Sequence, residues 1–346
     1  MLRHSDKKFF LLTLVLAVCT GLAIIVSTGM GYMTISAEGI LRVIGAHLLG
    51  NPSLVEGLEK TVPYVVMDVR LPRILTAALV GAGLAMSGVI YQGILLNPLA
   101  DPYTLGISSG AAFGASLALL ANVTLFGHFS TPLFAFVGAI LTLLTVMRLS
   151  TFNGQISAQT LILSGVIVGA ILSAGISFLK YLADEQVAII IFWLMGSFAS
   201  STWKGVMLVG CAALFGAIVA LFYGRDLNIM SLGRRSSDSL GVDTAKVRKI
   251  LLLTASLVTA VCVAVTGIIG FIGLIVPHLM RYLVGPDNRK LLPASAFAGA
   301  ILLLLADTVT RAVLPVEVPI GVLTALIGGP FFCVIFRQKQ KGRSYE

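Results

Sequence analysis

The chain has 346 residues, of which 57% are hydrophobic and only 11% are charged. A soluble domain carries about 25% charged residues, so this composition excludes an ordinary soluble globule. The mean hydropathy of +0.99 over the full length cannot come from one membrane anchor. A span needs about 20 residues, and the chain has room for roughly ten spans with short loops. The composition therefore predicts an all-α polytopic membrane protein, and membrane enzymes, channels and transporters all remain compatible with it.

Ten apolar runs, bounded by polar or charged residues, are the candidate membrane spans. The first run follows a basic N-terminus but exceeds the 7 to 15 residues of a signal-peptide core, so we expect it to be a retained span. One further run, residues 186–199, has only 14 residues and suits an interfacial or re-entrant helix better than a crossing. The ten candidates are residues 9–29, 74–96, 103–121, 131–149, 159–182, 205–223, 249–268, 270–284, 291–313 and 319–336.

The distribution of Lys and Arg residues favours a topology of ten spans with both termini in the cytoplasm. In this topology 17 of the 24 basic residues lie on the inner side, as the positive-inside rule requires. Counting residues 186–199 as an eleventh span would leave only 6 of them inside. The same bias accounts for the net charge of +9 without a nucleic-acid partner.

The chain contains no motif for nucleotide binding or for a zinc-dependent hydrolase. It has no G-x-x-x-x-G-K-[ST] phosphate loop and no H-E-x-x-H. Its four cysteines lie in apolar runs without the spacing of metal ligands, and His278 is the only histidine in a candidate span. We therefore expect no catalytic residue, no metal site and no cofactor, and any driving energy must come from elsewhere.

Few polar side chains lie at membrane depth. Gln92, Asn97 and Asp307 are near span ends or turns, where they can satisfy backbone groups that the turns leave free. An ion-coupled carrier would normally bury ionisable residues near the membrane midplane, where the coupling ions bind. An ion-coupled secondary transporter is therefore the alternative function, followed by a membrane scaffold without transport activity.

A polar segment, residues 225–248, interrupts the spans on the predicted cytoplasmic side. It has too many apolar residues for a solvated linker, and Gly233 and Gly241 divide it. The pattern predicts two short helices that present an apolar face to a partner, with Asp243 capping the next span. Packing against the protein's own inner surface is the alternative. The residues expected in this contact are Leu227, Ile229, Met230, Leu232, Leu240, Gly241 and Val242.

A short amphipathic helix is predicted between the first two spans. Ser36 can cap its first turn and Gly50 can end it. Such a helix would lie on the outer membrane surface. The residues predicted to share its apolar face are Ile40, Leu41, Ile44 and Leu48.

Three arginines are expected at the outer ends of spans. Arg70 and Arg73 flank Pro72 at the start of the second span, and Arg311 lies at the end of the ninth. They could receive the carboxylates of an acidic partner by bidentate pairing, or they could snorkel and fix the span ends. Their positions alone leave both roles open.

Several long motifs are distributed along the chain. The main one is R-L-P-R-I-L-T-A-A-L-V-G-A-G-L-A-M-S-G-V-I-Y-Q-G-I-L-L-N-P-L-A-D-P-Y-T-L-G-I-S-S-G-A, residues 70–111. Other motifs are W-L-M-G-S (193–197), S-L-G-V (239–242), G-F-I-G-L-I-V-P-H-L-M-R (270–281), L-L-L-A-D-T-V-T-R (303–311) and V-P-I-G-V-L-T-A-L-I-G-G-P-F-F (318–332). Together these motifs resemble the FecCD-type permeases, the membrane subunits of type II ABC importers for iron-siderophores, haem and cobalamin, and they cover nearly the whole chain in the expected order.

The resemblance implies a type II ABC importer permease fold in a bacterial or archaeal cytoplasmic membrane. It implies a homodimer or pseudo-dimer of ten-span subunits, two cytoplasmic ATP-binding subunits and an extracytoplasmic solute-binding protein. By the same resemblance, residues 227–242 contact the ATPase, and Arg70, Arg73 and Arg311 dock the binding protein. Residues 186–199 resemble the family's outer helix near the pathway mouth.

The resemblance also gives expectations for the pathway and the cargo. Pathways in this family are lined chiefly by the second, fifth and tenth spans, so candidate lining residues are Met86, Gln92, Ser164 and Ser173. The expected cargo is an iron-siderophore, otherwise haem or cobalamin, with an oxyanion such as molybdate as a further possibility.

Overall fold

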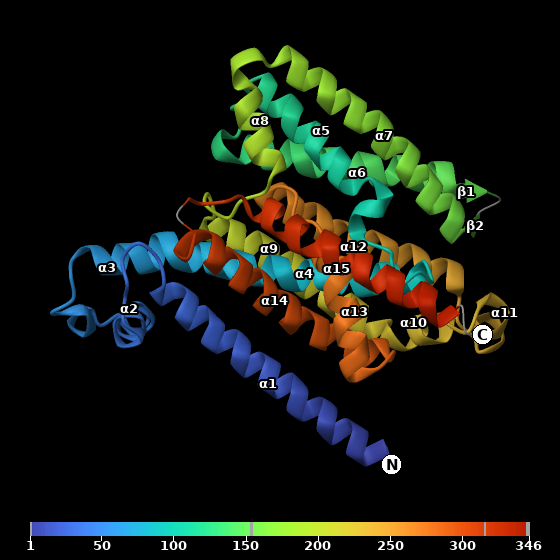
Figure 1. The fold of residues 1–346 in the computed structure, drawn as a ribbon, viewed down its shortest axis with the longest axis horizontal. Helices are drawn as coiled ribbons and strands as arrows, with labels where there is room; N and C mark the ends of the chain where they lie inside the picture. The colour runs from blue at the N-terminus through green and yellow to red at the C-terminus, as the bar shows by residue number, and fades with distance from the viewer. Residues whose placement is uncertain (1, 153–154, 315, 344–346) are drawn as a thin grey trace.

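Helices dominate the part of the chain that the structure, a computed structural model, describes: residues 2–152, 155–314 and 316–343 (Figure 1). One hairpin, β1 (Thr151–Phe152) and β2 (Gln155–Ile156), interrupts them. The longer helices are α1 (Leu2–Gly29), α4 (Leu71–Ile94), α5 (Ile107–Leu120), α6 (Ser130–Ser150), α7 (Ala158–Leu182), α9 (Trp203–Phe222), α12 (Thr244–Thr266), α13 (Ile272–Val284), α14 (Asn288–Ala312) and α15 (Ile320–Arg343). The shorter helices are α2 (Ala37–Leu49), α3 (Thr61–Tyr64), α8 (Val187–Leu194), α10 (Gly224–Met230) and α11 (Arg234–Ser239). The all-α fold class is confirmed.

Seven helices in the described residues are long and apolar enough to cross a membrane. One of them runs without a break from Thr61 to Ile94, because α3 and a π-helical turn, η2 (Val65–Arg70), lead directly into α4. Three shorter apolar helices follow the remaining predicted runs: Ile107–Leu120, Ile272–Val284 and Ile320–Val334. The protein is therefore a multi-pass membrane protein.

The bundle has two ends that carry different short elements. Figure 1 shows α2 and α3 at one end, called the α2 end below, and α10 and α11 at the opposite end, called the α10 end. The first turns of α1 and the last turns of α15 lie toward the α10 end. Helices α1 and α7 form opposite edges of the bundle, and α4 lies between them.

Helix α4 runs through the interior, since 20 of its 24 residues are buried. Small residues permit this position, because their neighbours approach the α4 backbone directly. A Cβ atom on Gly81 would collide with the carbonyl of Gly299 in α14, and one on Gly88 with the carbonyl of Gly273 in α13. Close packing of small residues is a common way to associate helices in a membrane.

Helix α2 has the predicted ends. The Ser36 hydroxyl accepts a hydrogen bond from the Gly39 N–H at 3.1 Å, and Gly50 ends the helix with a φ of 63°. Ile40 and Val43 are buried against the protein, whereas Leu41 and Leu48 are 56% and 77% exposed. The predicted apolar residues therefore divide between the protein core and the outer surface of the molecule.

The run 186–199 does not form a crossing helix. It folds into a 3-10 turn, η5 (Asp184–Gln186), and α8, which ends at Leu194. A helix of eight residues is about 12 Å long and cannot span the hydrocarbon core of a bilayer.

We predict that Gly81→Ala destabilises the protein, because the new methyl group meets the α14 backbone and overpacking costs about 1–3 kcal/mol. Gly21→Ala in α1 is the matched control, since nothing lies within 4 Å of a Cβ atom there. Thermal unfolding in detergent should show a lower midpoint for Gly81→Ala and no loss for Gly21→Ala. Equal midpoints in the two variants would contradict the packing described for α4.

Candidate functional site

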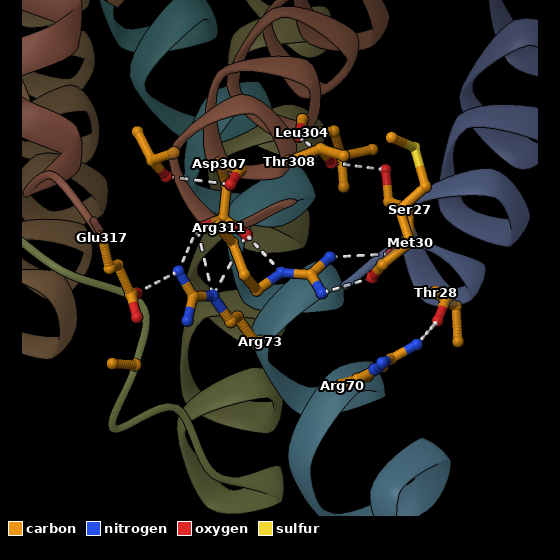
Figure 2. A network of polar contacts seen from close by, with 12 residues as sticks. Ser27, Thr28, Met30, Arg70, Arg73, Leu304, Asp307, Thr308, Arg311 and Glu317 are labelled. Carbon is orange, nitrogen blue, oxygen red and sulfur yellow. Dashed lines mark hydrogen bonds and ion pairs between the residues drawn. The ribbon is translucent and has the colours of Figure 1, made fainter. Parts of the chain in front are cut away.

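A polar network lies at the α2 end and contains the three predicted arginines (Figure 2). Its centre is Arg73, near the start of α4. The Arg73 guanidinium donates from Nε and Nη2 to Asp307 of α14, with a shortest distance of 2.8 Å. Nη2 also donates to Glu317 Oε1 at 2.6 Å. Arg73 and Asp307 are both buried, whereas the Glu317 side chain is 49% exposed.

The other two arginines bind carbonyls in the last turn of α1 and in the residues that follow it. Arg311 donates to the carbonyls of Met30 and Ser27 at 2.6 and 2.7 Å. Arg70 donates to the carbonyl of Thr28 at 2.7 Å and also to that of Met33. The last carbonyls of a helix lack partners within the helix and carry partial negative charge, so cations stabilise this terminus. The network therefore joins α1, α4 and α14 at one end of the bundle.

These contacts change how the three arginines can meet a partner. Two roles were open for them, pairing with an acidic partner and fixing the span ends, and the structure brings the three side chains together. However, each already binds groups of its own chain, and Arg70 and Arg73 are buried. Glu317 is the accessible member of the network. Glu317 could not be predicted as part of the site, because it lies between two predicted spans and belongs to no periodic pattern.

A cavity of about 500 Å³ adjoins the network at the α2 end. Arg73, Asp307 and Glu317 form its polar side, while Phe192 and Trp193 of α8 contribute apolar surface. The cavity combines ionised groups with aromatic rings, so it could accept a group with both polar and apolar parts.

The segment 225–248 forms two short helices at the α10 end, and Asp243 caps α12 by accepting from the Lys246 N–H at 3.0 Å. The residues expected to face a partner divide into two sets. Leu227, Met230 and Val242 are buried in the protein's own core. Leu227 lies against Gly93 at the end of α4. These three residues therefore hold the segment against the protein's own inner surface, which was the alternative to a contact with a partner.

The remaining apolar residues of this segment stay accessible. Leu232 and Leu240 are 62% and 60% exposed, and Ile229 is half-buried. Gly241 follows Leu240 with a φ of 81°, a conformation that favours glycine. The turn presents Leu240 outward, so Leu232 and Leu240 are both exposed apolar side chains at the α10 end.

Helix α10 is tied to the start of α14 by a small amide and carboxylate cluster. The Asn228 side chain donates to Asp287 Oδ1 at 2.6 Å and accepts from the Asn288 backbone N–H at 2.8 Å. Burial opposes ionisation of Asp287, but hydrogen bonds from Arg289 and Asn228 outweigh it and lower the pKa of this carboxyl. A lowered pKa keeps the carboxylate charged at neutral pH, and this contribution to stability is lost only as the pH falls through that pKa.

The four candidate pathway residues do not line one common surface. Met86, Gln92 and Ser164 are buried, whereas Ser173 is exposed on α7. Gln92 accepts a hydrogen bond from Arg281 at 3.0 Å and lies 3.4 Å from the carbonyl of Gly273. It therefore joins α4 to α13 in this conformation.

Comparison with known proteins identifies the family. The FecCD transport family matches residues 16–338. A cobalamin import system permease of Halobacterium salinarum is 43% identical over 82% of this chain and 76% of its own length. A molybdate import system permease of Haemophilus influenzae is 40% identical over 98% of both chains.

A solved structure of a metal-chelate type ABC transporter in an inward-facing conformation resembles this chain with a TM-score of 0.82. It is 36% identical and is covered over 98% of its length, while 94% of this chain is aligned. Because the family match extends over nearly the whole chain and the fold agrees, the chain belongs to the FecCD transport family.

Proposed function

We propose that this chain is the membrane-spanning permease of an ATP-driven importer and forms the translocation pathway for a metal chelate. The observation that carries the proposal is the family match over residues 16–338, together with the similarity to a metal-chelate type ABC transporter. The chain has no phosphate loop, so ATP is hydrolysed by two cytoplasmic ATP-binding subunits. The permease itself is not an enzyme.

The proposed cargo is an iron-siderophore, with haem and cobalamin as the alternatives. The similarity to a cobalamin import permease supports a metal chelate as the cargo. Molybdate is a second candidate, because the permease from Haemophilus influenzae aligns over 98% of both chains.

The first test asks whether ATP drives transport and which cargo is carried. The tagged chain, purified with its bound subunits and solute-binding protein, is reconstituted in liposomes that contain ATP. Radiolabelled ferric siderophore, hemin, cobalamin and molybdate are then offered separately. We expect uptake of ferric siderophore that ceases when the ATP-binding subunits are inactivated. Uptake that continues without ATP hydrolysis and follows an ion gradient would instead identify an ion-coupled secondary transporter.

The proposed topology has ten spans, with the α10 end in the cytoplasm. The seven long apolar helices and the three shorter ones correspond to the ten predicted runs. The basic residues of 225–249 belong to the α10 end, where the positive-inside rule favours them. A second copy of the chain is proposed to complete the pathway, with Ser173 of α7 among its lining residues.

We propose that α10 and α11 transmit the conformational change that accompanies ATP hydrolysis from the ATP-binding subunit to the permease. Leu232 and Leu240 provide the apolar contact with the ATP-binding subunit, assisted by Ile229 and the Gly241 turn. Leu227, Met230 and Val242 hold the two helices against the bundle. The Asn228 cluster adds a polar connection to α14.

Leu240→Asp should weaken association with the ATP-binding subunits without unfolding the permease. The carboxylate would have to be desolvated in an apolar contact, whereas in the free permease position 240 is exposed. Co-purification should fall by roughly tenfold or more, and ATP-dependent uptake should fall with it. Leu240→Met, which keeps the apolar surface, is the matched control and should behave as wild type. Full co-purification with Leu240→Asp would contradict the proposed contact.

We propose that the α2 end docks an extracytoplasmic solute-binding protein. A carboxylate of that protein would replace Glu317 on Arg73, while Arg70 and Arg311 add positive charge nearby. The buried pair with Asp307 would stay in place during this exchange, because Asp307 is 1% exposed. Glu317 therefore competes with the partner for the same guanidinium.

Glu317→Gln should raise the affinity of the permease for its solute-binding protein by roughly two- to fivefold, because a surface ion pair contributes up to about 1 kcal/mol. Glu38→Gln is the matched control, since it removes a carboxylate at the same end of the bundle from a side chain that is 80% exposed. The difference between the two variants should shrink at high salt. Equal affinities for both variants, measured by surface plasmon resonance, would contradict a competition at Arg73.

A further inference from the structure

A second cavity, of about 550 Å³, opens on the side of the bundle and belongs to neither site described above. Leu133 and Phe136 of α6 and Leu208 of α9 form two of its walls, and Val261 and Ala264 of α12 form its floor. Phe129, just before α6, lies at its rim. Leu133 and Leu208 are each more than 40% exposed, so the cavity is open to the membrane.

One cation lies at the mouth of this cavity. Lys204, in the first turn of α9, places its Nζ 5.5 Å from the centre of the Phe129 ring. Its side chain is exposed, and no carboxylate within the described residues lies within 4 Å of its Nζ. The ring holds the ammonium over the cavity through a cation–π contact, and the ammonium remains available for an anion.

The depth of these groups matches the border between the headgroups and the hydrocarbon core. Trp203 precedes Lys204, and its indole N–H donates to the carbonyl of Met67 at the α2 end. Tryptophan and lysine are typical of the membrane interface. Leu208 lies four residues further along α9, about 6 Å deeper into the bundle. From the membrane surface inward, the cation of Lys204 therefore comes first and the apolar cavity second.

We propose that this cavity binds one acyl chain of a phospholipid whose phosphate pairs with Lys204. A phospholipid carries its negative phosphate above its apolar chain, in the same order as the protein groups. The cavity volume falls within the range of about 300–1,000 Å³ typical of small-molecule sites. A second copy of this chain would cover the apolar walls, but an apolar helix face would leave the ammonium without an anion. The phospholipid satisfies both parts of the site.

Native mass spectrometry of the detergent-purified protein tests this proposal with phosphatidylglycerol as the probe. We expect about one retained phospholipid for each wild-type chain. Lys204→Glu should weaken retention by roughly fivefold or more, because an interfacial cation contributes about 1 kcal/mol toward anionic lipid and the glutamate adds repulsion. Leu208→Trp should also reduce retention, because the indole fills the cavity from an exposed position.

Two matched controls separate the site from general effects of charge and bulk. Lys180→Glu makes the same charge change at the end of α7, and Leu214→Trp adds the same ring to an exposed position of α9. Both should retain lipid as wild type does. Retention that is unchanged in Lys204→Glu or in Leu208→Trp would overturn the proposal, as would a covalent dimer formed by disulfide bonding through Leu208→Cys. Lipid retention is read without transport, so this result is independent of the proposed function.

Discussion

The bundle depends on the close approach of α4 to its neighbours. Burial of apolar surface does little to associate helices within a bilayer, because the lipid chains are equally apolar. Association must come from contact distance, and the glycines of α4 permit backbone contact with Gly299 in α14 and Gly273 in α13. Larger side chains at these positions would separate the helices. The small residues of α4 therefore determine where the surrounding helices can lie.

The two proposed partner sites are connected through this same pair of helices. Helix α4 carries Arg73 near one end and contacts Leu227 through Gly93 near the other. Helix α14 carries Asp307 at the α2 end and begins at the α10 end beside Asn228. Over these distances of about 30 Å the helices act as rigid elements. The same two helices therefore hold Arg73 and Asp307 at one end and support α10 at the other.

Local sequence signals predicted the parts of the fold that depend on a few neighbouring residues. The caps at Ser36, Gly50 and Asp243 are set by side-chain and backbone chemistry within one turn, and the structure contains them. The short run 186–199 was excluded as a crossing from its length and from the charge distribution. Its eight-residue helix α8 agrees with that expectation.

The direction of an apolar face could not be predicted in the same way. In a membrane protein an apolar side chain can face the protein core, the lipid or a partner, and periodicity does not distinguish these environments. Leu227 and Leu240 belong to one sequence pattern, yet Leu227 is 1% exposed and Leu240 is 60% exposed. Likewise, the acceptors of Arg70 are more than 35 residues away in the chain. Only the packing of α1 beside α4 brings them together.

The charge balance of the α2 network suits the acidic partner proposed for it. Three guanidinium groups face two carboxylates, Asp307 and Glu317, so one positive charge is left in excess. The Arg311 Nε–H is buried without a hydrogen-bond acceptor, at 3.9 Å from Asp307 Oδ2. A buried donor without a partner is costly, so this arrangement is less stable than a fully paired one. A carboxylate brought to the Glu317 side of the network would reduce the excess positive charge, whereas a basic partner would increase it.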